Sequence, residues 1–306
     1  MKTSLLIHPE ELDKRWIDRL VEFNYDTLSL HPHGGDEASK SLNELLSLLN
    51  KDEYRHLLDY AISKGLKIEY ECHAMSYLLD RELFKTHPEY FRINEKGERS
   101  NDYNFCVSNQ DALEIVGKNA LALAKKLYKS EHNYYIWADD NGSFCHCDKC
   151  KHLSPAEQNL IIMNKIYESI HEEIPDAKVA FLAYQGTLDT IKNVKKEEGI
   201  FLEYAPIERS FATSYISQGK DNINKIKDLL SFFGTKDSKV LEYWFDNSLF
   251  SKWKKPPKEY KLNEKVLKED LKLYKSLGFE YISSFACYLG QDYIDLYGEP
   301  KITSLK

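Results

Sequence analysis

The sequence lacks long apolar runs and any N-terminal targeting signal. No stretch approaches the ~18 apolar residues that a membrane-spanning helix requires. The uncharged stretch after Lys2 covers only residues 3–7, which is shorter than the roughly 7–15-residue apolar region of a secretory signal peptide. We therefore expect no membrane association and a cytoplasmic protein.

Basic tracts, a cysteine framework and glycine-rich loops are also missing. The net charge is −7 and lysine interleaves with glutamate, so a nucleic-acid partner is not expected. Six cysteines in 306 residues exclude a disulfide scaffold. Only 13 glycines occur, without a GxGxxG or Walker pattern, which argues against a doubly wound open sheet. No organic cofactor is expected. Oligomeric state is left open.

What the sequence does contain is an alternation of apolar runs and helical stretches. The expected strands are 4–8, 27–31, 67–72, 134–138, 178–184, 200–204, 239–245 and 281–286. The expected helices are 11–23, turns within 37–64, 111–128, 156–173, 188–194, 222–233 and 264–277. Nearly continuous apolar strands indicate parallel strands buried on both faces. We predict a single (β/α)8 barrel domain over 1–306, with extended loops after strands 3 and 4. A doubly wound open sheet is the alternative.

In such barrels the active site lies at the C-terminal strand ends. The polar and aromatic residues at or just after those ends form the candidate site. They are His8, His31, His33, Cys72, His73, Asp139, Asp140, Asn141, Tyr184, Gln185, Glu203, Glu208, Arg209, Trp244, Asp246, Tyr288, Gln291 and Asp292.

Several carboxylates in this set suit glycosidic-bond cleavage, which needs a proton donor and a second carboxylate. Asp139 and Asp140 are adjacent at the fourth strand's end. Neighbouring side chains of an extended segment point in opposite directions, so a bend at Asn141-Gly142 would be needed to bring both into one pocket. Glu208 and Asp246 are the opposing candidates. Asp139 or Asp140 could instead cap or hydrogen-bond loop amides, and Glu208 and Asp246 could instead be salt-bridge partners.

The histidines resemble a metal centre only superficially. HPHGGDE at 31–37 has the H-x-H spacing of metal-dependent amidohydrolase barrels, but no histidine follows His171. A catalytic histidine-metal centre is therefore disfavoured. His31, His33 and His73 are expected to bind sugar hydroxyls or to orient a carboxylate, or else to be satisfied rim histidines.

Three cysteines, Cys145, Cys147 and Cys150, fall within six residues. Their thiolates can converge on one tetrahedral zinc ion, which needs a fourth ligand. Cys106 is one candidate, because the loop after the third strand neighbours the fourth-strand loop in a barrel. His146 and His152 are local alternatives. Four thiolates would close the coordination sphere and make the zinc structural. Free thiols or a redox pair remain possible, and Cys72 and Cys287 are expected to be buried thiols.

Five segments together resemble one known family. They are HPEYFRINEKGER (87–99), NFCVSN (104–109), WADDNGSFCHCDKC (137–150), AFLAYQGT (180–187) and LEYWFDN (241–247). They resemble the glycosidase-like barrel family called domain of unknown function 4838, over about residues 60–250.

The resemblance implies a TIM barrel that cleaves or binds carbohydrate, distantly similar to β-hexosaminidases and α-glucuronidases. In hexosaminidases the fourth strand ends in Asp-Glu, which would place the acid at Asp140 and the substrate-orienting carboxylate at Asp139. Here an Asp stands where Glu is usual. Glu208 and Asp246 occupy places comparable to the later-strand carboxylates of α-glucuronidases. The match at Cys106 supports a four-cysteine zinc site.

The leading hypothesis is a glycoside hydrolase-like barrel whose partner is an oligosaccharide or glycoside. Asp140 is the expected general acid, and Asp139 orients the substrate or the acid. Asp246 or Glu208 serves as base or nucleophile. Stacking walls are expected from Tyr184, Trp244 and Tyr288, with Gln185 as a polar contact. The alternatives are a non-catalytic carbohydrate-binding barrel and a zinc-dependent hydrolase.

Overall fold

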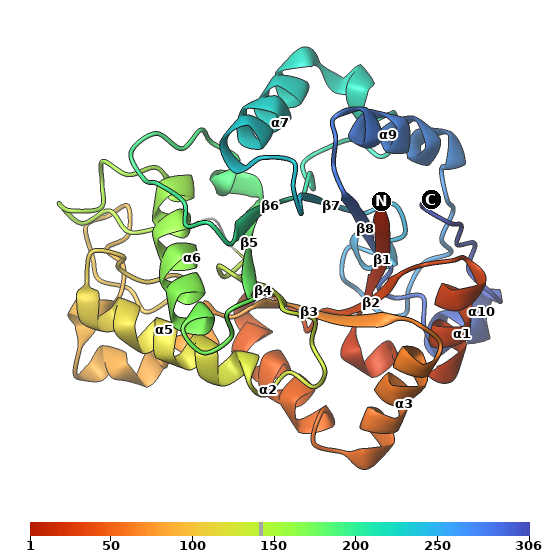
Figure 1. The fold of residues 1–306 in the computed structure, drawn as a ribbon, viewed down its shortest axis with the longest axis horizontal. Helices are drawn as coiled ribbons and strands as arrows, with labels where there is room; N and C mark the ends of the chain where they lie inside the picture. The colour runs from red at the N-terminus through yellow and green to blue at the C-terminus, as the bar shows by residue number, and fades with distance from the viewer. Residues whose placement is uncertain (141–142) are drawn as a thin grey trace. The chain divides into compact units, whose positions relative to one another are not determined.

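Eight parallel strands close into a barrel in the order β1 to β8 (Figure 1). The computed structural model describes residues 1–140 and 143–306. The strands are β1 Lys2–Ile7, β2 Thr27–Leu30, β3 Lys67–His73, β4 Asn133–Trp137, β5 Lys178–Ala183, β6 Ile200–Tyr204, β7 Lys239–Glu242 and β8 Tyr281–Phe285. The predicted (β/α)8 barrel is confirmed, and the open doubly wound sheet is excluded.

Helices separate the strands along the chain. They are α1 Lys14–Glu22, α2 Ala38–Leu48, α3 Asp52–Ser63, α4 Met75–Leu78, α5 Gln110–Ala124, α6 Pro155–His171, α7 Lys220–Phe233, α8 Asn247–Phe250, α9 Glu264–Ser276 and α10 Gln291–Tyr297. Short 3-10 turns add η1 Pro9–Glu11, η2 Gly35–Glu37, η3 Arg81–Lys85, η4 Pro88–Tyr90, η5 Gln185–Thr187 and η6 Tyr215–Gln218. Within residues 1–140 and 143–306, no helix is both long enough and apolar enough for a bilayer crossing.

The strands are buried on both faces, as their apolar runs predicted. In β5, residues 179–183 (VAFLA) are all buried. The parallel registers pair Ser4 with Thr27 between β1 and β2, and Lys2 with Tyr281 between β1 and β8. Parallel pairing in a closed barrel brings all carboxyl ends to one edge.

The chain divides into two compact units. The first unit comprises Met1–His31, Asn50–Glu69 and Glu203–Lys306, and the second comprises Pro32–Leu49 and Tyr70–Leu202. The predicted extended loops after strands 3 and 4 both belong to the second unit. The single-domain organisation stays a prediction.

Helix α6 supports the second unit and begins with a complete capping box. The Ser154 side chain accepts from the Glu157 N–H, the Glu157 carboxylate accepts from the Ser154 N–H, and Pro155 occupies the first turn. Helices α5 and α6 pack against each other, and α6 packs on β5 (Figure 1). The start of α6 is thereby fixed beside the ends of β4 and β5.

The predicted helix over 188–194 is wrong. Only the 3-10 turn η5 follows β5, and 188–194 has no helix. The other oxygen of the Glu157 carboxylate accepts from the N–H groups of Lys192 and Asn193, at 3.0 and 2.8 Å. These amides are therefore satisfied by a side chain instead of by helical carbonyls. Helix α10, which follows β8, was not predicted from the sequence either.

Charged side chains lie among the strands of the first unit. Lys239 is fully buried, and its Nζ lies 3.1 Å from a Glu203 carboxylate oxygen and 4.0 Å from Glu69. The Tyr281 hydroxyl donates to Glu69 at 3.0 Å. Barrel interiors are usually filled by branched apolar residues, so this ion-paired layer was not predictable from the apolar pattern.

Candidate functional site

The predicted site residues divide between the two units. Asp139, Asp140, His33, His73, Tyr184, Gln185 and the four cysteines belong to the second unit, whereas His31, Glu208, Trp244, Asp246 and Tyr288 belong to the first. Each group is described on its own.

Asp139, two residues after β4, is buried and fully engaged. Its carboxylate accepts from the N–H groups of Met75 and Ser76 at 2.9 and 3.0 Å, and from Arg81 at 3.0 Å. These two amides open the short helix α4, whose N–H groups have no partner within the helix. The Asp139 N–H itself donates to Asn104 at 3.0 Å. Asp139 therefore ties the end of β4 to the loop that follows β3.

Asp140 is half-buried and lies beside Gly34. A Cβ atom on Gly34 would stand 3.4 Å from Asp140 Oδ2 and 2.8 Å from the His73 ring. The second contact is too close for any side chain. Glycine at position 34 therefore allows the His73 and Asp140 side chains to pack against the loop that follows β2. The predicted bend at Asn141-Gly142 lies outside the described residues.

His73 ends β3 and is held in one orientation. Its Nδ1 lies 2.6 Å from the Ala138 carbonyl oxygen, which can only accept, so Nδ1 carries the proton. The ring meets Trp137 edge-on, with centroids 5.1 Å apart. His33 is half-buried, and its backbone N–H donates to the Ser41 hydroxyl at 2.8 Å.

A small cavity opens at the ends of β3, β4 and β5. It is lined by His73, Ala138, Asp139, Phe144, Asn159, Leu182, Tyr184 and Thr187. Three of these, His73, Asp139 and Tyr184, are residues that the sequence singled out. Gln185 donates to the Tyr184 hydroxyl at 3.1 Å and has a positive φ of 47°. Such backbone is uncommon outside glycine and often occurs at functional sites.

Asp246 caps the helix that follows it. Its Oδ1 accepts from the Ser248 hydroxyl at 2.5 Å, the Ser248 N–H at 3.0 Å and the Leu249 N–H at 3.3 Å. Burial raises the pKa of Asp246 to about 6, against the opposing effect of these hydrogen bonds. Asp246 thus caps a helix, whereas the alternative expected for this residue was a salt bridge.

Trp244 is not placed as a stacking wall. Its indole is 4% exposed and donates to Asp270 at 3.0 Å, while its backbone carbonyl accepts from the Tyr260 hydroxyl at 2.8 Å. The ring therefore packs inside the first unit, where a flat ligand has no access to its face.

Glu208 is exposed, but the residue after it is deeply anchored. Arg209 reaches Glu242 at 2.6 Å and Asp270 at 2.8 Å, and all three side chains are fully buried. The Tyr274 hydroxyl also donates to Glu242 at 2.5 Å. Burial raises the pKa of Glu242 to about 7 despite the nearby Arg209. This network was not predictable from the sequence pattern, and it fixes the loop that carries Glu208.

His31 and Tyr288 both lie next to His8, and the three rings form an aromatic group in the first unit. His8 Nδ1 lies 2.9 Å from the His31 carbonyl oxygen, and the His8 ring centroid is 5.9 Å from those of His31 and Tyr288. The nearby Glu11 was overlooked. It is buried, accepts from the His8 N–H at 3.3 Å, and burial raises its pKa to about 8.

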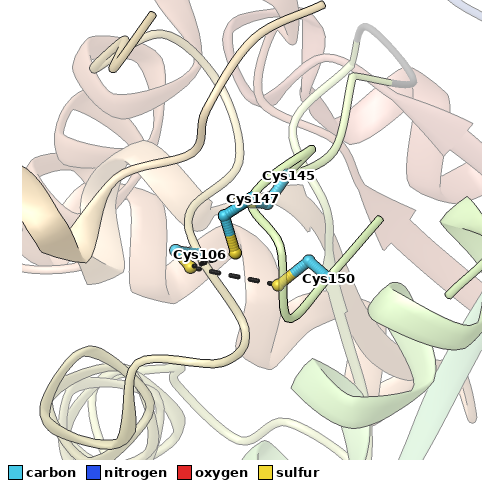
Figure 2. A group of neighbouring side chains, drawn as sticks. All are labelled: Cys106, Cys145, Cys147 and Cys150. Carbon is cyan, nitrogen blue, oxygen red and sulfur yellow. Dashed lines mark hydrogen bonds between the residues drawn. The ribbon is translucent and has the colours of Figure 1, made fainter. Parts of the chain in front are cut away.

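The four cysteines come together as predicted (Figure 2). The sulfur atoms of Cys106, Cys145, Cys147 and Cys150 all lie within 4.8 Å of one another. Cys106 Sγ is 3.7 Å from that of Cys147 and 3.9 Å from that of Cys150. Hydrogen bonds from the thiols of Cys145 and Cys150 hold the pKa of Cys106 well below its ordinary value. The cluster could hold a metal ion.

Surrounding groups fix the cysteine loop. The Gln158 side chain accepts from the Cys145 N–H at 2.9 Å and donates to the Cys145 carbonyl at 3.0 Å. The Ile93 N–H donates to Cys145 Sγ at 3.4 Å, and Ser108 Oγ lies 3.2 Å from Cys106 Sγ. Of the two histidines considered as fourth ligands, His146 instead lies 3.5 Å from Glu95.

The model of the family described as Domain of unknown function (DUF4838) matches residues 48–284. The chain belongs to this family. None of the curated proteins matches the sequence.

Several solved glycoside hydrolases are similar in fold. A β-galactosidase from the psychrophilic Marinomonas ef1 has a TM-score of 0.55 at 11% identity, covering 93% of this chain and 54% of that chain. Endo-glycoceramidase II from Rhodococcus sp. has a TM-score of 0.54 at 9% identity, covering 94% and 72%. A GH18 chitinase from Pseudoalteromonas aurantia has a TM-score of 0.52 at 9% identity, covering 97% and 96%. The chain therefore shares the barrel fold of these enzymes, and it spans about half the length of the β-galactosidase.

Proposed function

We propose that this barrel cleaves a glycosidic bond in an oligosaccharide or glycoside, with Asp140 as the proton donor. The observation that carries the proposal is the difference between the surroundings of the two adjacent carboxylates. Asp139 is held by two backbone amides and Arg81, whereas Asp140 is half-buried beside His73. A proton donor must be reachable by the glycosidic oxygen and held in place by its surroundings. Anchoring through Asp139 supplies the second requirement.

For the second carboxylate we favour Glu208 over Asp246. The Asp246 carboxylate already accepts three hydrogen bonds as a helix cap, and using it in catalysis would break them. Glu208 is exposed, and its neighbour Arg209 holds the loop through two buried carboxylates. A base or nucleophile on an anchored loop is held in a fixed position and orientation.

The second unit also supplies the better sugar-contacting residues. Tyr184 and His73 line one cavity, with Gln185 bonded to Tyr184, and aromatic faces beside polar groups suit sugar rings. His33 belongs to the same unit as a further polar contact. His31 and Tyr288 are 7% exposed, so in the proposal they support neighbouring loops instead of touching the sugar.

The four cysteines are proposed to hold zinc as a structural ion. Cys106 is the fourth ligand in this proposal, because its sulfur lies 3.7 Å from that of Cys147 and 3.9 Å from that of Cys150. A tetrahedral site of four thiolates leaves no position for water. Such an ion would stabilise the loops after β3 and β4, and with them the segment that carries Asp139 and Asp140. The donor set disfavours a zinc-dependent hydrolase.

A screen of aryl glycosides, uronides and N-acetylhexosaminides tests the function. On the substrate that the protein cleaves, Asp140→Asn should lower kcat at least a hundredfold without changing the melting temperature. Glu208→Gln should also lower kcat. Asp189→Asn is the matched control, since Asp189 is an exposed aspartate in the loop after β5. Unchanged turnover by Asp140→Asn would refute the assignment.

The second candidate is a carbohydrate-binding barrel without catalysis. One observation favours it: the Asp139 carboxylate is occupied by the backbone amides of Met75 and Ser76, and the Asp246 carboxylate by that of Ser248. This candidate predicts sugar-induced thermal stabilisation of the wild-type protein and no hydrolysis of any aryl glycoside. Turnover that disappears in Asp140→Asn excludes it.

A further inference from the structure

A buried polar atom without a partner faces the cavity at the ends of β3, β4 and β5. Asn159, in the second turn of α6, is 1% exposed and lines this cavity. No group in the described part of the chain hydrogen-bonds its Oδ1 atom. Buried polar atoms are nearly always paired, so an unpaired one needs an explanation. A ligand that brings a donor is one.

The asparagine is unlike its polar neighbours on the same helix. Glu157 holds the loop after η5, and Gln158 holds the cysteine loop. Both side chains are occupied by backbone groups. Asn159 is the third consecutive buried polar residue of α6, and it alone of the three presents an unpaired atom to the cavity. Packing does not require an amide there, since a leucine would fill similar space without a buried polar atom.

The size and lining of the cavity define what can enter. The cavity leaves about 20 Å³ for the centre of a water molecule, which is enough for one or two non-hydrogen atoms but not for a ring. Asn159 and Asp139 are among the residues that line it, and the unpaired Asn159 Oδ1 atom can only accept a hydrogen bond, as can an ionised carboxylate. The entering group must therefore donate. A hydroxyl or hydroxymethyl substituent meets both conditions, whereas a carboxylate does not.

We propose that Asn159 is a specificity-determining residue that accepts a hydrogen bond from one hydroxyl group of a bound sugar. The hydroxyl enters the cavity, and the ring stays outside because the cavity is too small for it. The inference rests on the proposed function for its class of ligand, but it concerns binding and does not depend on bond cleavage. It predicts that neutral sugars bind better than uronic acids at this position.

Binding measurements test the inference without relying on turnover. Methyl β-glycosides of glucose, galactose and N-acetylglucosamine are titrated calorimetrically into wild type, Asn159→Leu and a control. Asn164→Leu is the control, because Asn164 lies on the same helix but bonds to Lys195 and Glu197. Asn159→Leu should weaken the tightest glycoside roughly tenfold, with its melting temperature unchanged or raised. Asn164→Leu should lower the melting temperature and leave affinity unchanged.

Deoxy sugars then identify the partner hydroxyl. Removing one particular hydroxyl from the tightest glycoside should weaken binding to wild type about as much as Asn159→Leu does, and should have no further effect on that variant. Such non-additivity marks a direct interaction.

Three results would overturn the inference. They are wild-type affinity in Asn159→Leu, additive effects for every deoxy sugar, and no glycoside binding by the wild-type protein. The first two would leave a structural water as the partner of Oδ1. Failure of the proposed function looks different: hydrolysis is absent while the Asn159 binding effects persist.

Discussion

Replacing Arg209 with methionine should destabilise the protein strongly. The Arg209, Glu242 and Asp270 side chains are 0% exposed, with nitrogen–oxygen distances of 2.6 and 2.8 Å. Methionine matches the aliphatic part of the arginine side chain and carries no charge, so it removes the ion pairs while keeping that part of the packing. Removing one partner of a buried ion pair costs about 3–5 kcal/mol, because a charge is left uncompensated.

The structure places the expected loss within this range. Two carboxylates lose the cation that they share, which argues for a loss in the upper part of the range of about 3–5 kcal/mol. Other donors remain, however: Tyr274 to Glu242, and Trp244 with the Tyr215 N–H to Asp270. Glu242, with a pKa already raised to about 7 by burial, can also take up a proton. We therefore expect a loss of about 3 kcal/mol near pH 7.

Urea unfolding followed by circular dichroism measures this loss. Arg15→Met is the matched control, since the Arg15–Asp13 pair is exposed and should contribute under about 1 kcal/mol. Neutralising both carboxylates in Arg209→Met/Glu242→Gln/Asp270→Asn should recover part of the loss, because no buried charge remains. A loss below about 1 kcal/mol for Arg209→Met, or no recovery in the triple variant, would falsify the view that these charges are mutually compensating.

Two further predictions concern the other buried groups. The folded-state pKa of Asp246, about 6, exceeds its usual 3.8, so the folded state binds this proton more tightly and its contribution to stability falls as pH rises from about 4 to about 6. The free energy of unfolding of Asp246→Asn should therefore rise relative to that of wild type across this pH window, by at most about 3 kcal/mol. Urea unfolding at pH 4, 5, 6 and 7 measures the difference, and a difference that stays constant with pH would contradict the prediction. For the cysteines, elemental analysis should find one zinc per chain, and Cys150→Ser should lose it while Cys72→Ser keeps it. Chelation should unfold the protein as the metal leaves, whereas activity lost without unfolding would indicate a zinc hydrolase.

The barrel was predictable because its signal is local and repeated. Parallel strands buried on both faces require continuous apolar runs such as residues 179–183, and eight such runs alternate with helical stretches. The helix over 188–194 failed for a non-local reason. Its backbone amides are held by Glu157, a residue more than thirty positions earlier. Local propensity contains no information about such a partner.

The cysteine cluster and the strand-end residues were predictable in identity but not always in role. Spacing alone brought together Cys145, Cys147 and Cys150, and barrel topology with the family resemblance added Cys106. Trp244 lies at a strand end, yet its indole is satisfied by Asp270 from α9. Glu208 and Arg209 were both noted at a strand end, but the buried ion pairs of Arg209 with Glu242 and Asp270 were not predicted. Strand-end position selects candidates, but only long-range partners decide which of them can meet a ligand.

The adjacent aspartates after β4 show how those partners assign roles. Sequence reasoning required a bend that would bring both carboxylates into one pocket. In the structure the Asp139 carboxylate accepts hydrogen bonds from Met75, Ser76 and Arg81, and donating a proton to a ligand would require it to give up these contacts. Asp140 has no such set of donors among the described residues, so one carboxylate can anchor the strand end while the next performs acid chemistry. If so, Asp139→Asn should disturb stability and activity together, whereas Asp140→Asn should affect activity alone.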